Sequence, residues 1–213
     1  MNTIKFGEKD SYEDFGLILR PIKRPKPSPK YEYVSIPGRN GDIDLTEAFG
    51  DVFYENLSFP LEFNVIDAIN TWNDKVRTIT NYLHGKKMLV TFSDDPNYYY
   101  QGRITINELS SDRNIGVLSL DCNFEPYKYK KEITTKEYEV VEGGTYTFTN
   151  GRMKVVPTLT LSGDMTISFN GKNISLNEGT YKALEIEFVE GANDITIVTG
   201  SGTLKATYQE GDL

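Results

Sequence analysis

"LSFPLEFNV", residues Leu57–Val65, sets the fold class of this chain. Apolar residues alternate with other residues along its whole length, and in an extended strand residues two apart point to the same face. The stretch therefore predicts a strand with one buried and one wet face. Pro60 has no N–H to donate and lies on the wet parity, which predicts that the strand is at a sheet edge or carries a bulge.

The spacing of apolar residues then changes from two to three and four, which is the spacing of one helical face. It predicts one helix over about residues 71–84, packed against a sheet. Thr71 is its expected N-cap, with Asp74 three residues later, and Gly85 is its expected stop. The apolar stripe consists of Trp72, Val76, Ile79 and Leu83.

Strands are predicted on both sides of this helix. Cys122 shares its parity with Leu118, Leu120 and Phe124, so it is expected in the core. The strands are expected at Phe15–Ile22, Tyr31–Ile36, Lys87–Phe92, Tyr98–Leu109 and Gly116–Phe124.

From about Ile133 onward the chain consists of short β-like runs separated by turn residues. The pairs Gly143-Gly144, Asn150-Gly151 and Asn170-Gly171 are strong hairpin signals. The spacing predicts a small β-sandwich. We therefore expect a mostly β protein with two domains: residues 1–132, an α+β domain with one packed helix, and residues 133–213, a sandwich.

Composition narrows the class of protein. Aromatic residues make up 12% of the 213 residues, which favours strands, and the single cysteine excludes a disulfide framework. A net charge of -8 argues against nucleic-acid binding, because phosphates need a surplus of cations. No secretory signal and no membrane span are expected, since no apolar run is long enough.

The stretch "RPIKRPKPSPK", from Arg20 to Lys30, is rich in proline and carries no acid. Prolines at alternate positions favour extended backbone and exclude a helix or a central strand. Two interpretations stay equal: an exposed segment that binds an acidic partner, or a solvated connection. The basic residues are Arg20, Lys23, Arg24, Lys26 and Lys30.

The search for catalytic and metal sites gives negative results. His84 is the only histidine, which excludes two-histidine metal sites, and it has no orienting partners for catalysis with Cys122. The pairs Asp42/Asp44 and Glu185/Glu187 are expected on wet strand faces. The stretch "NGDIDLTE" fits neither an EF-hand nor a P-loop. We expect no enzyme, no cofactor and no metal.

The order of these features resembles the distal tail proteins of phages and prophages with long non-contractile tails. The resemblance covers roughly residues 1–130 and rests on "FGLIL", "YVSIPGRNGDIDLTE", "LSFPLEFNV", "YLHGKKMLVTFSDDPNYYYQGRI" and "FEPYKY", in this order. "GANDITIVTGSGTLKATY" is similar to the galectin-like sandwich of that family. The resemblance implies a structural protein of the virion tail tip, made in the cytoplasm of the bacterial host.

The resemblance also implies partners. The N-terminal domain would close into a hexameric ring between the tail tube protein and a tail-associated adhesion or lysin protein. The sandwich would anchor receptor-binding proteins. In this setting the loop Ser35–Gly50 is interpreted as a β-corner, and its turn is a candidate subunit contact. The turn residues are Pro37, Gly38, Arg39, Asn40 and Gly41.

A second hypothesis belongs to a different class. The sandwich would be a carbohydrate-binding module for host attachment, presenting Tyr146, Tyr181 or Tyr208 to sugar rings. A glycosidase that uses Glu185 and Glu187 finds no support, because nothing in "LEIEF" implies a cleft.

Overall fold

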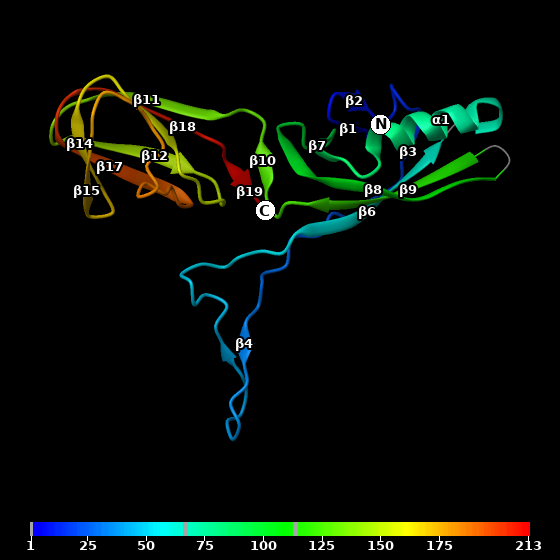
Figure 1. Cartoon of the computed structure of the whole chain (residues 1–213), viewed down its shortest axis with the longest axis horizontal. Helices are drawn as coiled ribbons and strands as arrows, with labels where there is room; N and C mark the ends of the chain where they lie inside the picture. Colours follow the sequence, from blue (N-terminus) through cyan, green and yellow to red (C-terminus); the bar gives the residue numbers. More distant parts are fainter. Residues whose placement is uncertain (1, 66–67, 113–114) are drawn as a thin grey trace. The chain divides into compact units, whose positions relative to one another are not determined.

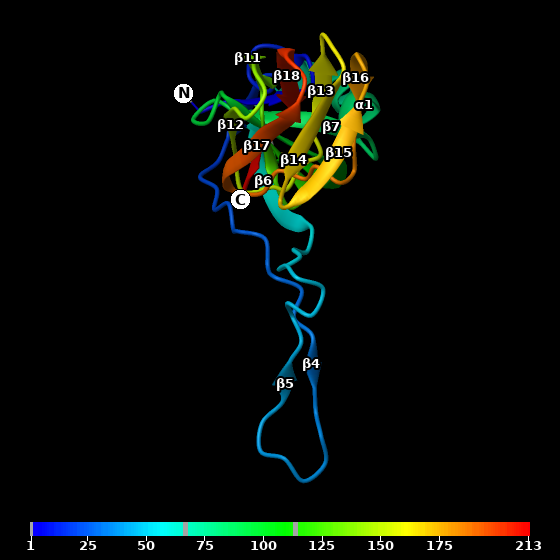
Figure 2. The same ribbon diagram turned by 90° about the vertical axis from the view of Figure 1, so that its left-hand side faces the viewer.

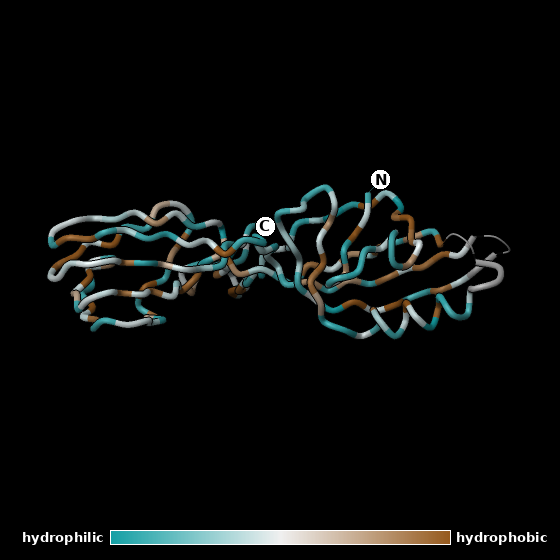
Figure 3. Tube along the Cα trace, turned by 90° about the horizontal axis from the view of Figure 1, so that it is seen from above, coloured by the Kyte–Doolittle hydropathy of each residue, from teal (hydrophilic) through white to brown (hydrophobic). Residues whose placement is uncertain are grey.

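The computed structural model describes residues 2–65, 68–112 and 115–213. The chain divides into two compact units, Met1–Lys128 with Leu213, and Tyr129–Asp212. This division lies a few residues before the boundary set from the sequence. Each unit has its own hydrophobic core, and Figure 3 shows hydrophobic stretches recurring along the strands of both. The chain is mostly β with one helix among the described residues, as predicted.

The first unit is built on one antiparallel sheet with the strand order β2-β1-β7-β8-β9-β6-β3 (Figure 1). The long β8–β9 and β6–β9 pairs form its centre. The strands are β1 (Ile4–Phe6), β2 (Lys9–Asp10), β3 (Leu17–Leu19), β6 (Leu57–Val65), β7 (Lys87–Phe92), β8 (Tyr98–Asp112) and β9 (Ile115–Phe124).

Strand β6 has the alternating burial that its sequence predicts. Pro60 pairs opposite Asp121 without a bulge. The Glu62 carbonyl accepts from Arg20 N on the β3 side, so the backbone N of Pro60, two residues away, faces the same side. Strand β3 pairs only with Phe63–Val65. Pro60 therefore lies where β6 is locally an edge, and its missing N–H breaks no ladder bond.

Helix α1 (Ala68–Leu83) packs on one face of the sheet. Ile79 and Leu83 are buried in the core, and Trp72 is partly buried against it. The helix begins before Thr71, so the predicted N-cap is wrong: Thr71 lies within the helix. The predicted stop is confirmed, because Gly85 has a φ of 74°, a left-handed conformation that glycine adopts without strain. No described helix is long and apolar enough to cross a membrane.

The second unit consists of two four-stranded antiparallel sheets that enclose one core, as a β-sandwich does. Their strand orders are β11-β18-β13-β16 and β12-β17-β14-β15. The strands are β11 (Thr134–Val140), β12 (Thr145–Asn150), β13 (Thr158–Leu161), β14 (Met165–Phe169), β15 (Lys172–Leu176), β16 (Gly179–Tyr181), β17 (Gly191–Thr199) and β18 (Gly202–Tyr208). Near the C-terminus β10 (Lys128–Lys130) pairs with β19 (Gly211–Asp212).

One hairpin prediction is confirmed and one strand prediction is wrong in this unit. Asn170 and Gly171 both have positive φ and join β14 to β15. Glu185 and Glu187 were expected on the wet face of a strand, but their stretch is instead a turn, in which Ile186 N donates to Ala183 O, followed by a bridge between Val155 and Phe188. Leu184 in this turn is 77% exposed.

Candidate functional site

A long excursion leaves the first unit between β3 and β6. We call residues 31–53 the arm, and Arg20–Lys30 the basic segment. Figures 1 and 2 show the arm, in blue and cyan, running away from the sheet and turning back at its far end. Its only paired strands are β4 (Tyr33–Val34) and β5 (Ile43–Asp44), far shorter than the predicted Tyr31–Ile36.

The base of the arm is closed by main-chain contacts. Pro29 and Tyr54 form an isolated antiparallel bridge. Lys30 N donates to Phe53 O, and Glu55 N donates to Ser28 O, both at 2.8 Å. The two ends of the arm therefore lie next to each other.

The turn Pro37–Gly41 lies at the far end of the arm. Gly38 and Gly41 have φ angles of 83° and 76°, and Arg39 N donates to Ile36 O at 3.1 Å. The glycines thus supply the predicted reversal. Asp42 and Asp44 were expected on the wet face of a strand with the alternating apolar residues facing inward, but no buried face exists here, because Leu45 is exposed and Ile43 only half-buried. The five turn residues are all exposed.

Asp44 of this loop serves local structure. The Asp44 carboxylate accepts from Thr46 N at 2.9 Å. Hydrogen bonds from the Thr46 side chain and backbone lower the pKa of Asp44. Within the described residues, no group of three or more His, Cys, Asp or Glu side chains is placed to hold a metal ion.

The arm concentrates exposed apolar side chains. Half of the exposed large hydrophobic residues in the described ranges belong to it, and Phe49 is 90% exposed. The sequence analysis missed these residues. Their signal was the length of the excursion, since loops of this length without secondary structure are uncommon and usually functional. The residues are Tyr31, Tyr33, Val34, Ile36, Leu45, Phe49 and Phe53.

Three cations of the basic segment are anchored and two are free in the part of the chain that the structure describes. Lys26 Nζ donates to Leu213 O at 2.7 Å. Arg20 donates to Asn64 Oδ1 at 2.9 Å and pairs with Glu62 at 3.0 Å. Arg24 pairs with Asp94 at 2.5 Å, and its guanidinium lies 4.7 Å from the centre of the Phe92 ring. The side chains of Lys23 and Lys30 are exposed and form no hydrogen bond or ion pair within the described residues.

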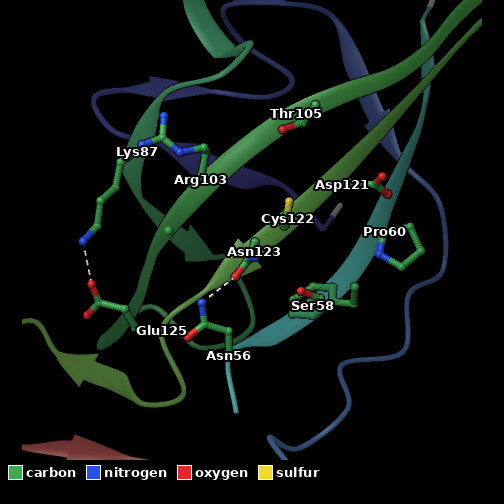
Figure 4. Close-up of a pocket in the computed structure, with 12 residues that line it drawn as sticks. Asn56, Ser58, Pro60, Lys87, Arg103, Thr105, Asp121, Cys122, Asn123 and Glu125 are labelled. Carbon is green, nitrogen blue, oxygen red and sulfur yellow. Dashed lines mark hydrogen bonds and ion pairs between the residues drawn. The ribbon is translucent and has the colours of Figure 1, made fainter.

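A polar groove of about 710 Å³ lies on the sheet face opposite α1. Figure 4 shows its side chains on β6, β7, β8 and β9. Lys87 pairs with Glu125 at 2.6 Å, and Asn56 Nδ2 donates to Asn123 Oδ1 at 2.9 Å. Charges of both signs line this groove. Its remaining labelled residues are Ser58, Pro60, Arg103, Thr105, Asp121 and Cys122.

The expected core position of Cys122 is confirmed, because the residue is 1% exposed. Burial, and then the charge of Asp121, raises the pKa of its thiol to about 12, so the reactive thiolate is suppressed. His84 lies at the end of α1, where its Nδ1 accepts from Ile106 N at 3.1 Å. Glu187 forms an ion pair with Lys154 at 3.7 Å.

The three tyrosines expected to bind sugar do not form an open platform. Tyr208 is 3% exposed, and its hydroxyl donates to Thr149 O at 2.5 Å. The Tyr146 hydroxyl accepts from Val141 N at 3.0 Å, and its ring packs 5.4 Å from that of Tyr138. Tyr181 is partly buried against the core. The rings that were expected to meet sugar thus pack in or against the core of the sandwich.

No family model matches the chain. No curated protein matches its sequence. Among solved structures, the chain is similar to SPP1 Dit (gp 19.1), described as a paradigm of the hub adsorption apparatus in phages that infect Gram-positive bacteria. The TM-score is 0.71 at 14% identity, and the match covers 98% of this chain and 99% of that one. The chain therefore has a Dit-like fold, that of a phage distal tail protein.

Proposed function

We propose that the protein is a structural component of a phage tail tip. Its copies form a ring, a hexamer as in the family that the sequence resembles, and this ring joins the tail tube protein to the adhesion or lysin protein. The sandwich is proposed to anchor receptor-binding proteins. The support is a Dit-like fold along almost the whole chain, together with an arm whose large apolar side chains are exposed in a single copy.

The arm is the observation that most supports ring formation. Full burial of a large apolar side chain contributes about 1.5–3 kcal/mol, so the exposed rings of Phe49 and Phe53 favour a covering surface. Exposed apolar patches of this kind mark interaction sites. In a ring, each arm lies on the neighbouring copy. The turn residues Pro37, Gly38, Arg39, Asn40 and Gly41 are proposed as part of this contact.

An arm-deleted variant tests this proposal. Because Pro29 and Tyr54 are bridged, residues 31–53 can be replaced by Gly-Ser-Gly without separating the strands at the base. Wild-type protein, alone and co-expressed with tail tube and adhesion proteins, is expected to give closed rings in negative-stain electron microscopy and matching masses in light scattering. The arm-deleted chain is expected to remain folded by circular dichroism and to give no rings.

Two results would contradict the proposal. If wild-type protein forms no closed oligomer under any of these conditions, the hub function is wrong. If the arm-deleted chain still closes, the arm is not the contact. Arg39→Glu is a milder variant, expected to weaken ring assembly more than folding.

A further inference from the structure

The near end of the arm presents aromatic rings beside carboxylates. Tyr31 and Tyr33 are stacked, with ring centres 5.9 Å apart and planes inclined by 16°, and they are 60% and 54% exposed. A groove of about 380 Å³ passes this point. It is lined by Pro29, Tyr31, Asp44, Thr46, Glu47 and Val52.

The carboxylates at this groove are available to a partner. The side chains of Glu32 and Glu47 are exposed and form no ion pair within the described residues. The arm as a whole carries five acids and one arginine, a net charge of -4. An exposed stacked pair of rings beside free acids suits a cationic, extended ligand.

The basic segment has the complementary chemistry. It carries five cations and no acid, and its four prolines hold it extended. Up to Ser28 it has no strand or helix pairing. Aromatic-lined grooves bind extended proline-rich segments because such segments lose little entropy on binding. Lys23 and Lys30 point their free ammonium groups to solvent, ready for carboxylates.

Within one chain only the end of the basic segment reaches the groove, where Pro29 is one of the lining residues. The rest of the segment is held elsewhere on its own chain. Arg20 contacts Glu62 and Asn64, Arg24 pairs with Asp94, and Lys26 donates to Leu213 O, whereas the last residues are fixed by the Pro29–Tyr54 bridge. The arm begins only after that bridge and runs away from it (Figure 1). The part of the segment around Lys23 that can enter the groove therefore comes from a second copy of the chain.

We propose that the groove beside Tyr31 and Tyr33 binds the basic segment of a second copy, with Glu32 and Glu47 opposite Lys23 and Lys30. This contact rests on the proposed function for the identity of the second copy as the ring neighbour. It adds the two surfaces that meet and the chemistry that joins them.

Photo-crosslinking tests the contact without requiring a closed ring. Tyr33→p-benzoylphenylalanine protein is mixed with isotope-labelled wild-type protein, irradiated and mapped by mass spectrometry. Crosslinks between labelled and unlabelled chains are expected at residues 20–30. Intermolecular crosslinks elsewhere, or none at concentrations where wild-type protein associates or at the highest soluble concentration, would overturn the proposal. Crosslinks at residues 20–30 without rings would refute the hub and leave the contact standing.

A charge exchange tests the pairing itself. Glu32→Lys with Glu47→Lys, or Lys23→Glu with Lys30→Glu, is expected to reduce the crosslink about tenfold or more, since like charges repel across an interface. Mixing the two variants, or combining all four changes in one chain, is expected to restore it. Matched controls are Lys172→Glu and Glu185→Lys, exposed residues of the second unit. Loss without restoration, or no loss, would refute the pairing.

Discussion

Tyr208 shows how a side chain can satisfy a free carbonyl at the edge of a sheet. Strand β12 is the outer strand of its sheet. The hydroxyls of Tyr208 and Tyr138, both from the opposite sheet, donate to its Thr149 and Thr147 carbonyls at 2.5 and 2.7 Å. Carbonyls at an edge strand otherwise invite another chain. The two tyrosines therefore protect β12 from unwanted strand pairing.

Tyr208→Phe removes one of these donors and leaves the ring in place. We expect the free energy of unfolding to fall by about 1 kcal/mol, the usual contribution of one hydrogen bond. Urea unfolding followed by circular dichroism measures it. Tyr181→Phe is the control, because the Tyr181 hydroxyl has no hydrogen-bond partner within the described residues. Equal effects of the two changes would show that the hydroxyl contact is unimportant.

The same hydroxyl gives a pH dependence. Burial first, then the charges of Glu210 and Tyr138, raises the pKa of Tyr208 to about 12. The fold thus favours the neutral phenol, so this contribution is complete below the ordinary pKa of about 10 and is lost between about pH 10 and 12. The stability difference between wild type and Tyr208→Phe should shrink over that interval. A constant difference would contradict it.

At the scale of residues, the sequence predicts well which side chains share a strand face, and poorly which of the two faces is covered. Cys122 was placed in the core by its alternation with Leu118 and Leu120, and this is confirmed. Tyr208 alternates with Leu204 and Ala206 in the same manner, yet its ring was assigned to sugar. Alternation along a strand shows which side chains share a face, but only the position of the second sheet shows which face is covered.

At the scale of elements, Gly102 fixes how closely β8 approaches β9. It pairs opposite Phe124, and a Cβ at this position would lie 2.2 Å from Asn123 O. Real Cβ atoms do not come this close to backbone oxygen. The approach of the two central strands therefore depends on the absence of a side chain.

Gly102→Ala is expected to lower the free energy of unfolding by about 1–3 kcal/mol, the range for overpacking. Thermal and urea unfolding measure the loss. Gly163→Ala is the control, because its Cβ would lie 3.2 Å from the nearest atom, Ser201 O, and a small shift relieves it. A smaller loss at Gly102 than at Gly163 would show that the strands separate freely.

Elements with a strict period were predictable, and those without one were not. Strand β6 and the buried face of α1 follow from their spacing alone. The arm has apolar residues without a face to bury them on, so Tyr31–Ile36 was read as a strand although only Tyr33–Val34 pairs. In the proposed ring these residues would be covered by the neighbouring copy, and the spacing of apolar residues within one chain carries no signal for such a surface.

At the scale of the whole molecule, the two units have separate hydrophobic cores. We expect two unfolding transitions in calorimetry. Gly102→Ala should shift only the transition of the first unit, and Tyr208→Phe only that of the second. A single transition shifted by both changes would show that the units unfold together.

The arm has a consequence for the number of copies in an assembly. In the proposed ring, the contact between a groove on one copy and a different segment on the next is heterologous, so every copy both gives and receives. Such a contact ends only when the rotation from copy to copy divides a full circle; otherwise it continues as an open helix. We therefore expect the angle at the Pro29–Tyr54 base to set the number of copies in the proposed ring. Changes at this base should yield filaments or rings of another size rather than monomers.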